Sequence, residues 1–427
     1  MIKTLLQARQ LRHSWRMPPS KMEELQTKKL RAILRHAYFS VPFYHRKFDE
    51  AGVKPDDIRT VEDLERIPPT TKDEIQRAPI HDILSKSFDP KKCKRDITSG
   101  TSGVPLTTYM DKDALDFYSA VWLAVFRENG VKFLDKKAII GEPRNFQKRS
   151  WTEYFGIMRQ KYLSIFDDAQ TQLGALKTFR PDIIEGYPSS LSIIADLNRK
   201  QKEGLNSRLV FTQAETLDRE TRKLISLSFE ADLLDYYGSS EFSLIAWECP
   251  KHVGYHVNSD CMVVEFLRKG DSVDGSERGE ITCTSLVNYA MPLIRYRQGD
   301  IGVALKEPCP CGKTLPSMKI IEGRTDDFLT ALDGRIISPT IFFPYPFRDF
   351  SKIKQFSVIQ ENRNELRIQL IVDGNSLADE VLNEAEKEIR KVFGQDMQVR
   401  FEFLDEFKRD PSGKIKKIVS RVPVSFG

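Results

Sequence analysis

The sequence of 427 residues contains no long apolar run, few cysteines and little net charge. No uninterrupted apolar stretch reaches about 18 residues, the length needed to span a membrane as a helix. Residues 1–10 return to charge after a short apolar segment, unlike a secretory signal, so we expect a cytoplasmic protein. Low-complexity tracts and fixed-period repeats are also missing. With 40% hydrophobic and 30% charged residues, the composition indicates an ordinary globular protein.

The balance of charge gives no basis for a nucleic-acid partner, because 66 basic and 61 acidic residues leave a formal net charge of +5. The densest basic stretch is residues 1–35, where cations alternate with leucines and aromatics at roughly helical spacing. This pattern is typical of a solvated helical face. Docking on an acidic surface or an anionic membrane is the alternative, and the same helices could support a homodimer.

The chain divides into three regions of different pattern. Residues 1–77 predict helices broken by proline-containing turns. Between 92 and 322, helix-like stretches alternate with short apolar strands, which predicts an α/β domain with parallel strands. We therefore expect a large N-terminal α/β domain, 1–322, with a helical lead-in, and a small C-terminal α+β domain, 323–427. The expected helices are 22–37, 61–67, 113–128, 170–178 and 377–393; the expected strands are 138–140, 183–184, 209–212, 233–236, 355–359, 366–372 and 397–403.

A loop rich in glycine and hydroxyl groups follows the helical lead-in. Its glycines allow backbone N–H groups to converge on an anion, and its hydroxyls add further donors, so it could bind phosphates. It lacks the Gly-Lys-Ser/Thr ending of a Walker loop. A plain turn is the alternative, since such clusters are common in turns. The loop consists of Thr98, Ser99, Gly100, Thr101, Ser102 and Gly103.

Two later segments combine a tyrosine, a glycine and an acid. The first directly follows the strand expected at 233–236; there a tyrosine could stack on a base, and Glu241 could bind Mg²⁺. A turn with a surface acid is the alternative. In the second segment, 296–300, Asp300 behind a glycine is suited to accept hydrogen bonds from ribose hydroxyls. The first segment consists of Tyr237, Gly238, Ser239, Ser240 and Glu241.

Two further segments lie toward the C-terminus. Residues 324–327 form the expected connection between the domains. Residues 412–417 place Lys414 directly behind a glycine, after a predicted strand. A solvated basic tail is the alternative interpretation of this loop.

In this order and with these separations, the five segments resemble the adenylate-forming superfamily, which contains acyl-CoA and aryl-CoA synthetases, luciferases and nonribosomal adenylation domains. A narrower resemblance is to the phenylacetate-CoA ligase family, especially its CapK-like members found with capsular polysaccharide biosynthesis. It covers nearly the whole chain. It rests on LRHAYFSVPFY at 34–44, LERIPPTTK at 64–72, GYPSS at 186–190 and NYAMPLIRY at 288–296.

The resemblance implies ATP-dependent activation of a carboxylic acid as its acyl-adenylate, with release of pyrophosphate and transfer of the acyl group to coenzyme A. It implies that residues 98–103 bind the ATP phosphates, Tyr237 flanks the adenine, Asp300 binds the ribose and Glu241 ligates Mg²⁺. Two alternatives remain open. One is acyl transfer to an amine or hydroxyl in polysaccharide biosynthesis, and the other is a non-catalytic nucleotide-binding partner protein.

The resemblance also assigns residues at the domain connection and in the small domain. Lys414 matches the family's catalytic lysine, Arg324 a nucleotide contact, and Asp326 the hinge about which the small domain moves. The sequence departs from the family in three places. Val104 stands where many relatives carry lysine after the glycine-rich loop, and Ala214 precedes Glu215 where the family has glycine. The terminal loop reads Asp410-Pro411-Ser412 before Gly413.

Four cysteine and histidine side chains form a candidate structural zinc site. Cys309 and Cys311 are a tight pair, and Cys249 lies earlier in the same predicted domain. With a histidine they would supply tetrahedral Cys/His ligation of Zn²⁺. We expect His256 rather than His252 as the fourth ligand, because it better matches the family's Gly-x-His pattern. Free cysteines are the alternative, since a Cys-x-Cys spacing is shorter than usual. The remaining cysteines, Cys93, Cys261 and Cys283, are expected to be buried thiols.

Overall fold

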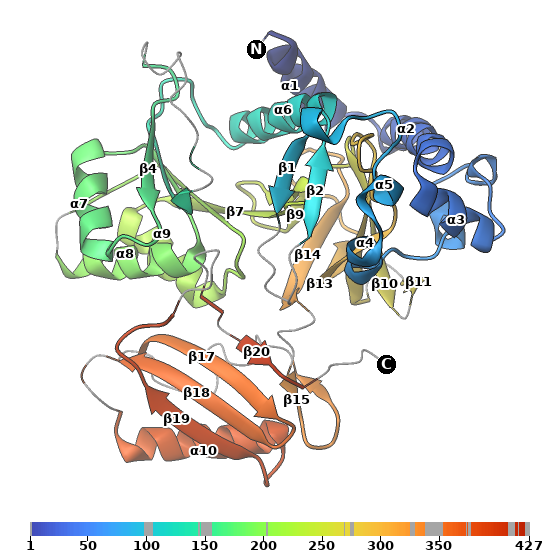
Figure 1. Cartoon of the computed structure of the whole chain (residues 1–427). Coiled ribbons are helices and arrows are strands. Elements are labelled where there is room, and N and C mark those ends of the chain that lie inside the picture. Colours follow the sequence, from blue (N-terminus) through green and yellow to red (C-terminus); the bar gives the residue numbers. More distant parts are fainter. Residues whose placement is uncertain are drawn as a thin grey trace. The chain divides into compact units, whose positions relative to one another are not determined.

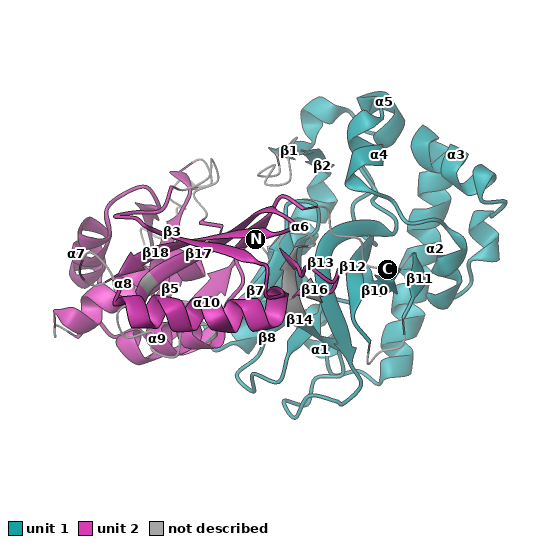
Figure 2. Cartoon of the chain, turned by 90° about the horizontal axis from the view of Figure 1, so that it is seen from below, with its two compact units in different colours: residues 1–131, 236–321 teal, residues 132–235, 322–427 magenta. Residues whose placement is uncertain are grey.

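A computed structural model gives the fold of the chain (Figure 1). The chain forms two compact units, each built from two segments (Figure 2). Unit 1 comprises Met1–Val131 and Tyr236–Ile321, and unit 2 comprises Lys132–Asp235 and Glu322–Gly427. Among the described residues, no helix combines the length and apolar character needed to cross a membrane. The structure describes residues 2–97, 106–143, 146, 156–201, 204–268, 270–273, 277–324, 329–337, 353–372, 374, 377–408, 415–416 and 418–422.

The helical lead-in belongs to unit 1. Its helices are α1 (Ile2–Ser14), α2 (Pro19–Ser40), α3 (Pro42–Glu50) and α4 (Lys72–Arg77), with 3₁₀ turns η1 (Pro55–Asp57) and η2 (Glu62–Arg66). After it, unit 1 adds α5 (Ile80–Ile83), the 3₁₀ turn η3 (Pro90–Lys92) and α6 (Lys112–Glu128). Prolines occupy the first turns of α2 and α3, where a missing N–H costs nothing. Asp111 caps α6 by accepting from the Ala114 N–H. Buried side chains of α2 and α3 pack with Val263, Leu286 and Ile294 in one core.

The sheet of unit 1 follows the strand order β11-β10-β12-β13-β14-β9-β8-β7. Its strands are β7 (Asp232–Ser239), which begins in unit 2, β8 (Ser243–Glu248), β9 (Tyr255–Val257), β10 (Met262–Arg268), β11 (Asp271–Ser272), β12 (Gly279–Ser285), β13 (Tyr296–Leu305) and β14 (Ser317–Arg324). A separate hairpin joins β1 (Lys94–Ile97) and β2 (Thr107–Met110). The pairs β7–β8, β8–β9, β9–β14, β10–β12 and β12–β13 are antiparallel. The prediction of parallel strands is therefore wrong here, because connections without crossover helices return each strand antiparallel.

Glu128, the last residue of α6, is a buried acid that joins three segments of unit 1. Its carboxylate accepts hydrogen bonds of 2.6 Å from Arg12 and 2.6 Å from Arg16, and lies 3.2 Å from the Lys313 ammonium. The Glu128 and Lys313 side chains are only 3% and 5% exposed. Burial alone would raise the pKa of Glu128, but the hydrogen bonds from Arg16 and Arg12 and the charge of Lys313 lower it to about 2. The acid thus holds α1 and the segment after β13 against α6.

The Glu128→Gln variant is expected to lower the free energy of unfolding by about 3 kcal/mol near pH 7, because Lys313 would remain as a buried cation without its anion. Since the pKa of Glu128 in the folded protein lies below the ordinary value of 4.5, its stabilisation is complete above pH 4.5 and is lost as the pH falls toward 2. Urea denaturation near pH 7 and near pH 4 measures both effects. The control is Asp113→Asn, which removes the exposed partner of Lys3 and should change little. Equal effects of the two substitutions would contradict this role of Glu128.

The first segment of unit 2 is an α/β layer with parallel strands, as predicted. Its elements are β3 (Lys137–Gly141), β4 (Gln160–Ser164), α7 (Ala169–Phe179), β5 (Ile183–Gly186), α8 (Pro188–Lys200), β6 (Leu209–Gln213) and α9 (Arg219–Phe229). The order is β4-β3-β5-β6, with every pair parallel. Asp168 and Asp218 cap α7 and α9. The helices and strands share a core that includes Ile184, Leu191 and Ile225.

The C-terminal module is a small α+β domain, as predicted, with a core of its own. Its elements are β15 (Leu329–Thr330), β16 (Ile336–Ile337), β17 (Ile353–Asn362), β18 (Glu365–Val372), α10 (Asp379–Phe393), β19 (Gln398–Phe403) and β20 (Ile418–Ser420). Its main sheet has the order β19-β18-β17-β20. Burial alternates along β18, and α10 adds Ala385, Ile389 and Phe393 from one face to the same core. The chain is thus a large α/β body with a small C-terminal domain. The boundary at residue 322 stays a prediction.

Candidate nucleotide and metal sites

The segment from Tyr237 to Glu241 lies on β7 and in the turn after it. The strand continues to Ser239, three residues beyond its predicted end, because it pairs with β8. At Gly238 a Cβ atom would lie 2.2 Å from the Ser243 carbonyl oxygen, so only glycine allows this approach of the two strands. Tyr237, Ser239, Ser240 and Glu241 are all half-buried. The pairing therefore places Glu241 just beyond the strand end.

Asp300 sits in a bulge of β13. Residues 298–300 lie opposite the single residue Ile281 of β12, between the pairs Arg297–Thr282 and Ile301–Glu280. Gly299 adopts φ +82°, a left-handed conformation that glycine takes without strain. Bulges of this kind redirect side chains away from the regular alternation of a strand. The bulge accounts for the half-buried position of the Asp300 carboxylate.

Two tyrosine hydroxyls connect these segments. The Tyr237 hydroxyl donates to Asp300 Oδ2 at 2.6 Å, and the Tyr296 hydroxyl donates to Glu241 Oε1 at 3.1 Å. Each segment thus supplies a tyrosine to the acid of the other. The structure brings together the adenine, ribose and magnesium residues that the resemblance assigns, and it adds Tyr296, to which the sequence interpretation gave no role.

Other predicted site residues lie at or beyond the edge of the described structure. The loop 98–103, Asp326 and Lys414 lie outside the described residues, and the side chain of Arg324 at the end of β14 is also not described. The flanks of the glycine-rich loop are paired, with Ile97 opposite Thr107. The assignments of these residues stay predictions.

Within unit 2, Ile415, the residue after Lys414, contacts Glu215, which alanine precedes where the family has glycine. The backbone N–H of Ile415 donates to Glu215 Oε1 at 3.4 Å. The same carboxylate accepts hydrogen bonds of 2.9 Å from both the backbone N–H and the hydroxyl of Ser189, the second residue of α8. Glu215 therefore keeps ordered hydrogen bonds although alanine precedes it.

The four predicted zinc ligands meet at one place in unit 1. Cys249 follows β8, His256 lies in β9, and Cys309 and Cys311 lie in the segment between β13 and β14. The candidate ligand atoms of all four residues lie within 4.8 Å of one another. The Cys249 and Cys309 sulfurs are 3.7 Å apart, and Cys311 Sγ is 3.2 Å from His256 Nε2. Tetrahedral zinc with bonds of about 2.3 Å separates two sulfurs by about 3.8 Å, so the donor set fits this ion.

The surroundings of the cluster favour the protonation states that metal binding needs at His256 and Cys311, whereas burial raises the pKa of Cys249 to about 12. Burial and the nearby Lys313 charge lower the pKa of His256 to about 4, which leaves a neutral imidazole near pH 7. Burial would raise the pKa of Cys311, but hydrogen bonds from the Lys313 backbone and Cys309 and the Lys313 charge outweigh it and lower that pKa. The other ring nitrogen of His256 lies 3.4 Å from the Ser317 hydroxyl, which can hold the ring in place.

The other three cysteines and the alternative ligand His252 are not part of the cluster. All six cysteines are free thiols. Cys261 and Cys283 are fully buried, as predicted, whereas Cys93 is half-exposed. The prediction is wrong for Cys93 because it lies between a short 3₁₀ turn and a two-stranded hairpin, which offer little apolar cover. His252 faces Glu248 at 3.9 Å instead of joining the cluster.

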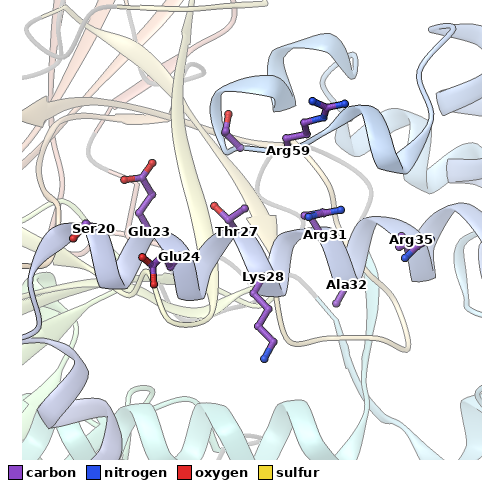
Figure 3. A pocket seen from close by; sticks show the side chains of 10 residues that line it. Ser20, Glu23, Glu24, Thr27, Lys28, Arg31, Ala32, Arg35 and Arg59 are labelled. Atoms are coloured by element: carbon purple, nitrogen blue, oxygen red, sulfur yellow. The ribbon is translucent and has the colours of Figure 1, made fainter.

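A groove beside α2 lies apart in sequence from the residues assigned to both sites. Figure 3 shows side chains of α2 along it, with Arg59 near its other wall. Its volume is about 740 Å³. Four cations and two acids line it. Its lining residues are Ser20, Glu23, Glu24, Thr27, Lys28, Arg31, Ala32, Arg35, Arg59 and Thr60.

Comparison with known proteins gives consistent relatives over most of the chain. Phenylacetate-coenzyme A ligase of Escherichia coli (strain K12) is 30% identical over 320 residues, which cover 72% of this chain and 72% of the relative. Protein CapK of Staphylococcus aureus is 22% identical over 414 residues, covering 93% and 89%. The family model of the CapK C-terminal domain matches residues 329–421.

A solved structure shows the same fold. The structure of a 2-hydroxyisobutyryl-CoA ligase, in the postadenylation state with an acyl-AMP ligand, aligns with a TM-score of 0.78 at 18% identity. The alignment covers 95% of this chain and 91% of that protein. The identity to the E. coli ligase over more than two thirds of both chains shows that the chain belongs to the phenylacetate-coenzyme A ligase family.

Proposed function

We propose that this protein activates a carboxylic acid with ATP and Mg²⁺ as an acyl-adenylate, releases pyrophosphate, and transfers the acyl group to coenzyme A. The observation that carries the proposal is the pairing of the 237–241 and 296–300 segments, which sets Tyr237, Glu241 and Asp300 in one site. The relatives named as CoA ligases support the same reaction.

The arrangement suits the charge problem of the first half-reaction. A carboxylate that attacks the α-phosphorus of ATP meets negative charge on both reactants, so the site must supply cations and alignment. Magnesium bound by Glu241 would neutralise phosphate charge. Asp300 can accept hydrogen bonds from the ribose hydroxyls, and the Tyr237 ring offers a flat surface to the adenine. The resemblance assigns phosphate binding to the loop 98–103, a nucleotide contact to Arg324 and the catalytic ammonium to Lys414.

We also propose that Cys249, His256, Cys309 and Cys311 hold a structural zinc ion. Four protein ligands leave no open position for a catalytic water, which is the arrangement of structural sites. Three thiolates and a neutral imidazole around Zn²⁺ carry one net negative charge, and the Lys313 ammonium, 3.8 Å from Cys311 Sγ, would offset it. A cytoplasmic location suits these ligands, because thiols stay reduced there.

A second candidate function keeps the adenylation but changes the acceptor to an amine or hydroxyl of a sugar or amino acid. Its motive is the resemblance to CapK-like members found with capsular polysaccharide biosynthesis; the CapK C-terminal family model matches residues 329–421, and Protein CapK is among the relatives.

Pyrophosphate release tests both candidates. The protein is incubated with ATP and Mg²⁺ against aryl, fatty, hydroxy and amino acids, with and without coenzyme A. We expect release that depends on one class of acid and a thioester product when coenzyme A is present. Acid-dependent release without thioester formation would support the second acceptor class. ATP binding without release for any acid in a broad panel would favour a non-catalytic partner protein and contradict the proposal.

A further inference from the structure

Tyr296 is a buried residue whose only polar side-chain atom reaches the proposed magnesium ligand. Its side chain lies at the start of β13, and the residue is 2% exposed. The hydroxyl lies 3.1 Å from Glu241 Oε1. Since a phenol near neutral pH is a donor toward a carboxylate, this contact orients the acid as well as touching it.

The position of the Tyr296 ring is fixed by its neighbours. The ring packs against fully buried Phe242, with centroids 6.1 Å apart. Its backbone lies opposite Cys283 of β12 on one side. On the other side the backbone N–H of Thr70 donates to the Arg295 carbonyl at 2.8 Å, and the backbone carbonyl of Thr70 accepts from the Arg297 N–H at 2.9 Å. Backbone hydrogen bonds on both sides of Tyr296 and the packing of its ring on Phe242 therefore fix the position of the hydroxyl.

The arrangement is repeated with the roles exchanged. In both segments a tyrosine stands four residues before an acid: Tyr237 before Glu241, and Tyr296 before Asp300. Each tyrosine donates to the acid of the opposite segment. A change in the position of one segment would therefore disturb the acid of the other, which couples the magnesium and ribose ends of the proposed site.

We propose that Tyr296 is a positioning residue that orients the Glu241 carboxylate for Mg²⁺. This proposal rests on the proposed function, in which Glu241 is the magnesium ligand. A hydrogen bond to Oε1 fixes the rotation of the carboxylate and leaves lone pairs on Oε2 for a hard cation. Residues that orient a metal ligand typically change metal affinity by about 10- to 100-fold when they are removed.

The test uses the Tyr296→Phe variant, which keeps the packed ring and removes the hydroxyl. Mn²⁺ replaces Mg²⁺, and its binding to the full-length enzyme with α,β-methylene-ATP is followed by electron paramagnetic resonance. We expect the Mn²⁺ dissociation constant to rise roughly tenfold. The Mg²⁺ concentration for half-maximal pyrophosphate release should rise by a similar factor, while the KM for the carboxylic acid stays the same.

The matched control is Tyr118→Phe, which removes another buried phenol of unit 1, from α6, and should leave Mn²⁺ binding unchanged. A second variant, Glu241→Asp, keeps the charge but shortens the side chain away from the Tyr296 hydroxyl, and it should weaken Mn²⁺ binding even if Tyr296→Phe does not fold. Equal Mn²⁺ dissociation constants in wild type and in folded Tyr296→Phe would overturn the proposal.

The Glu241→Gln variant distinguishes a failure of the magnesium-ligand assignment from a failure of the positioning role of Tyr296. If it abolishes Mn²⁺ binding while Tyr296→Phe has no effect, the magnesium ligand stands and the positioning role fails. If Glu241→Gln binds Mn²⁺ as the wild type does, the assignment of Glu241 in the proposed function fails. If both weaken binding, adding Tyr296→Phe to Glu241→Gln should cause no further loss, because the hydroxyl acts through the carboxylate.

Discussion

Replacing Lys414 with alanine is expected to slow acyl-adenylate formation by roughly a hundred- to a thousandfold, the usual effect of removing one group that stabilises developing charge. The physical reason is that attack on the α-phosphorus gathers negative charge, and the ammonium would be one of its few counterions. Lys414 lies outside the described residues, so the prediction rests on its match to the family's catalytic lysine. Acid-dependent pyrophosphate release under saturating ATP and Mg²⁺ measures the effect.

The two half-reactions distinguish a catalytic lysine from a structural one. If Lys414 acts only in adenylation, the variant supplied with a synthetic acyl-adenylate should transfer the acyl group to coenzyme A at nearly the wild-type rate. Lys416→Ala is the matched control, because it removes the same charge two residues away, from an exposed side chain. Unchanged adenylation by Lys414→Ala, or equal losses in Lys414→Ala and Lys416→Ala, would show that the lysine was wrongly assigned.

The fold was predictable where local pattern and topology agree. Residues 113–128 and 170–178 carry amphipathic patterns behind capping aspartates, and α6 and α7 match them within a residue or two at each end. The alternation of helix and strand correctly predicted the parallel layer from β3 to β6. The prediction of parallel strands was wrongly extended to residue 322. No helix separates the strands from β8 to β14 among the described residues, and this absence makes their pairing antiparallel.

The sequence was enough to pick out the residues of the candidate site, but not the contacts between them. Glu241 and Asp300 stand out in the sequence because glycine and tyrosine surround them. The hydroxyl of Tyr296 reaches Glu241 across 55 residues of chain, and that contact depends on the register of β12 with β13 and of β7 with β8. A repeated tyrosine-to-acid spacing of four residues is the signal that could have suggested it.

The choice of histidine was likewise decided by register. His256 lies directly opposite Ser317 in the β9–β14 pair, close to the segment that carries Cys309 and Cys311, whereas His252 precedes the strand. A Gly-x-His pattern favoured His256 in the sequence, and the structure places it in the cysteine cluster. The role of Lys313 could not be read from the sequence, because its partners Glu128 and Cys311 meet only through packing of α6 against the segment after β13.

Purified wild-type protein is expected to contain about one zinc ion per chain, and Cys309→Ser should contain almost none. Loss of a structural metal is among the few single changes that destabilise a protein by more than about 4 kcal/mol. For a unit of this size that corresponds to a fall in Tm of roughly 10 °C. Elemental analysis by mass spectrometry and thermal unfolding measure the two effects, with and without a zinc chelator.

The consequence of zinc loss should be local before it is global, because the cluster is packed against the lead-in. Trp247 contacts both His256 and Trp15 in tilted ring pairs, each with centroids 5.2 Å apart, and the Thr314 N–H donates to the Trp15 carbonyl at 2.8 Å. Chelation should therefore speed amide exchange in α1 before it does so in α6. Cys261→Ser, which alters a fully buried thiol outside the cluster, should retain zinc and show neither effect. Wild-type protein that carries no zinc after growth in zinc-supplemented medium, and whose Tm is unchanged by chelator, would leave the four side chains as a packed group of free thiols and an imidazole.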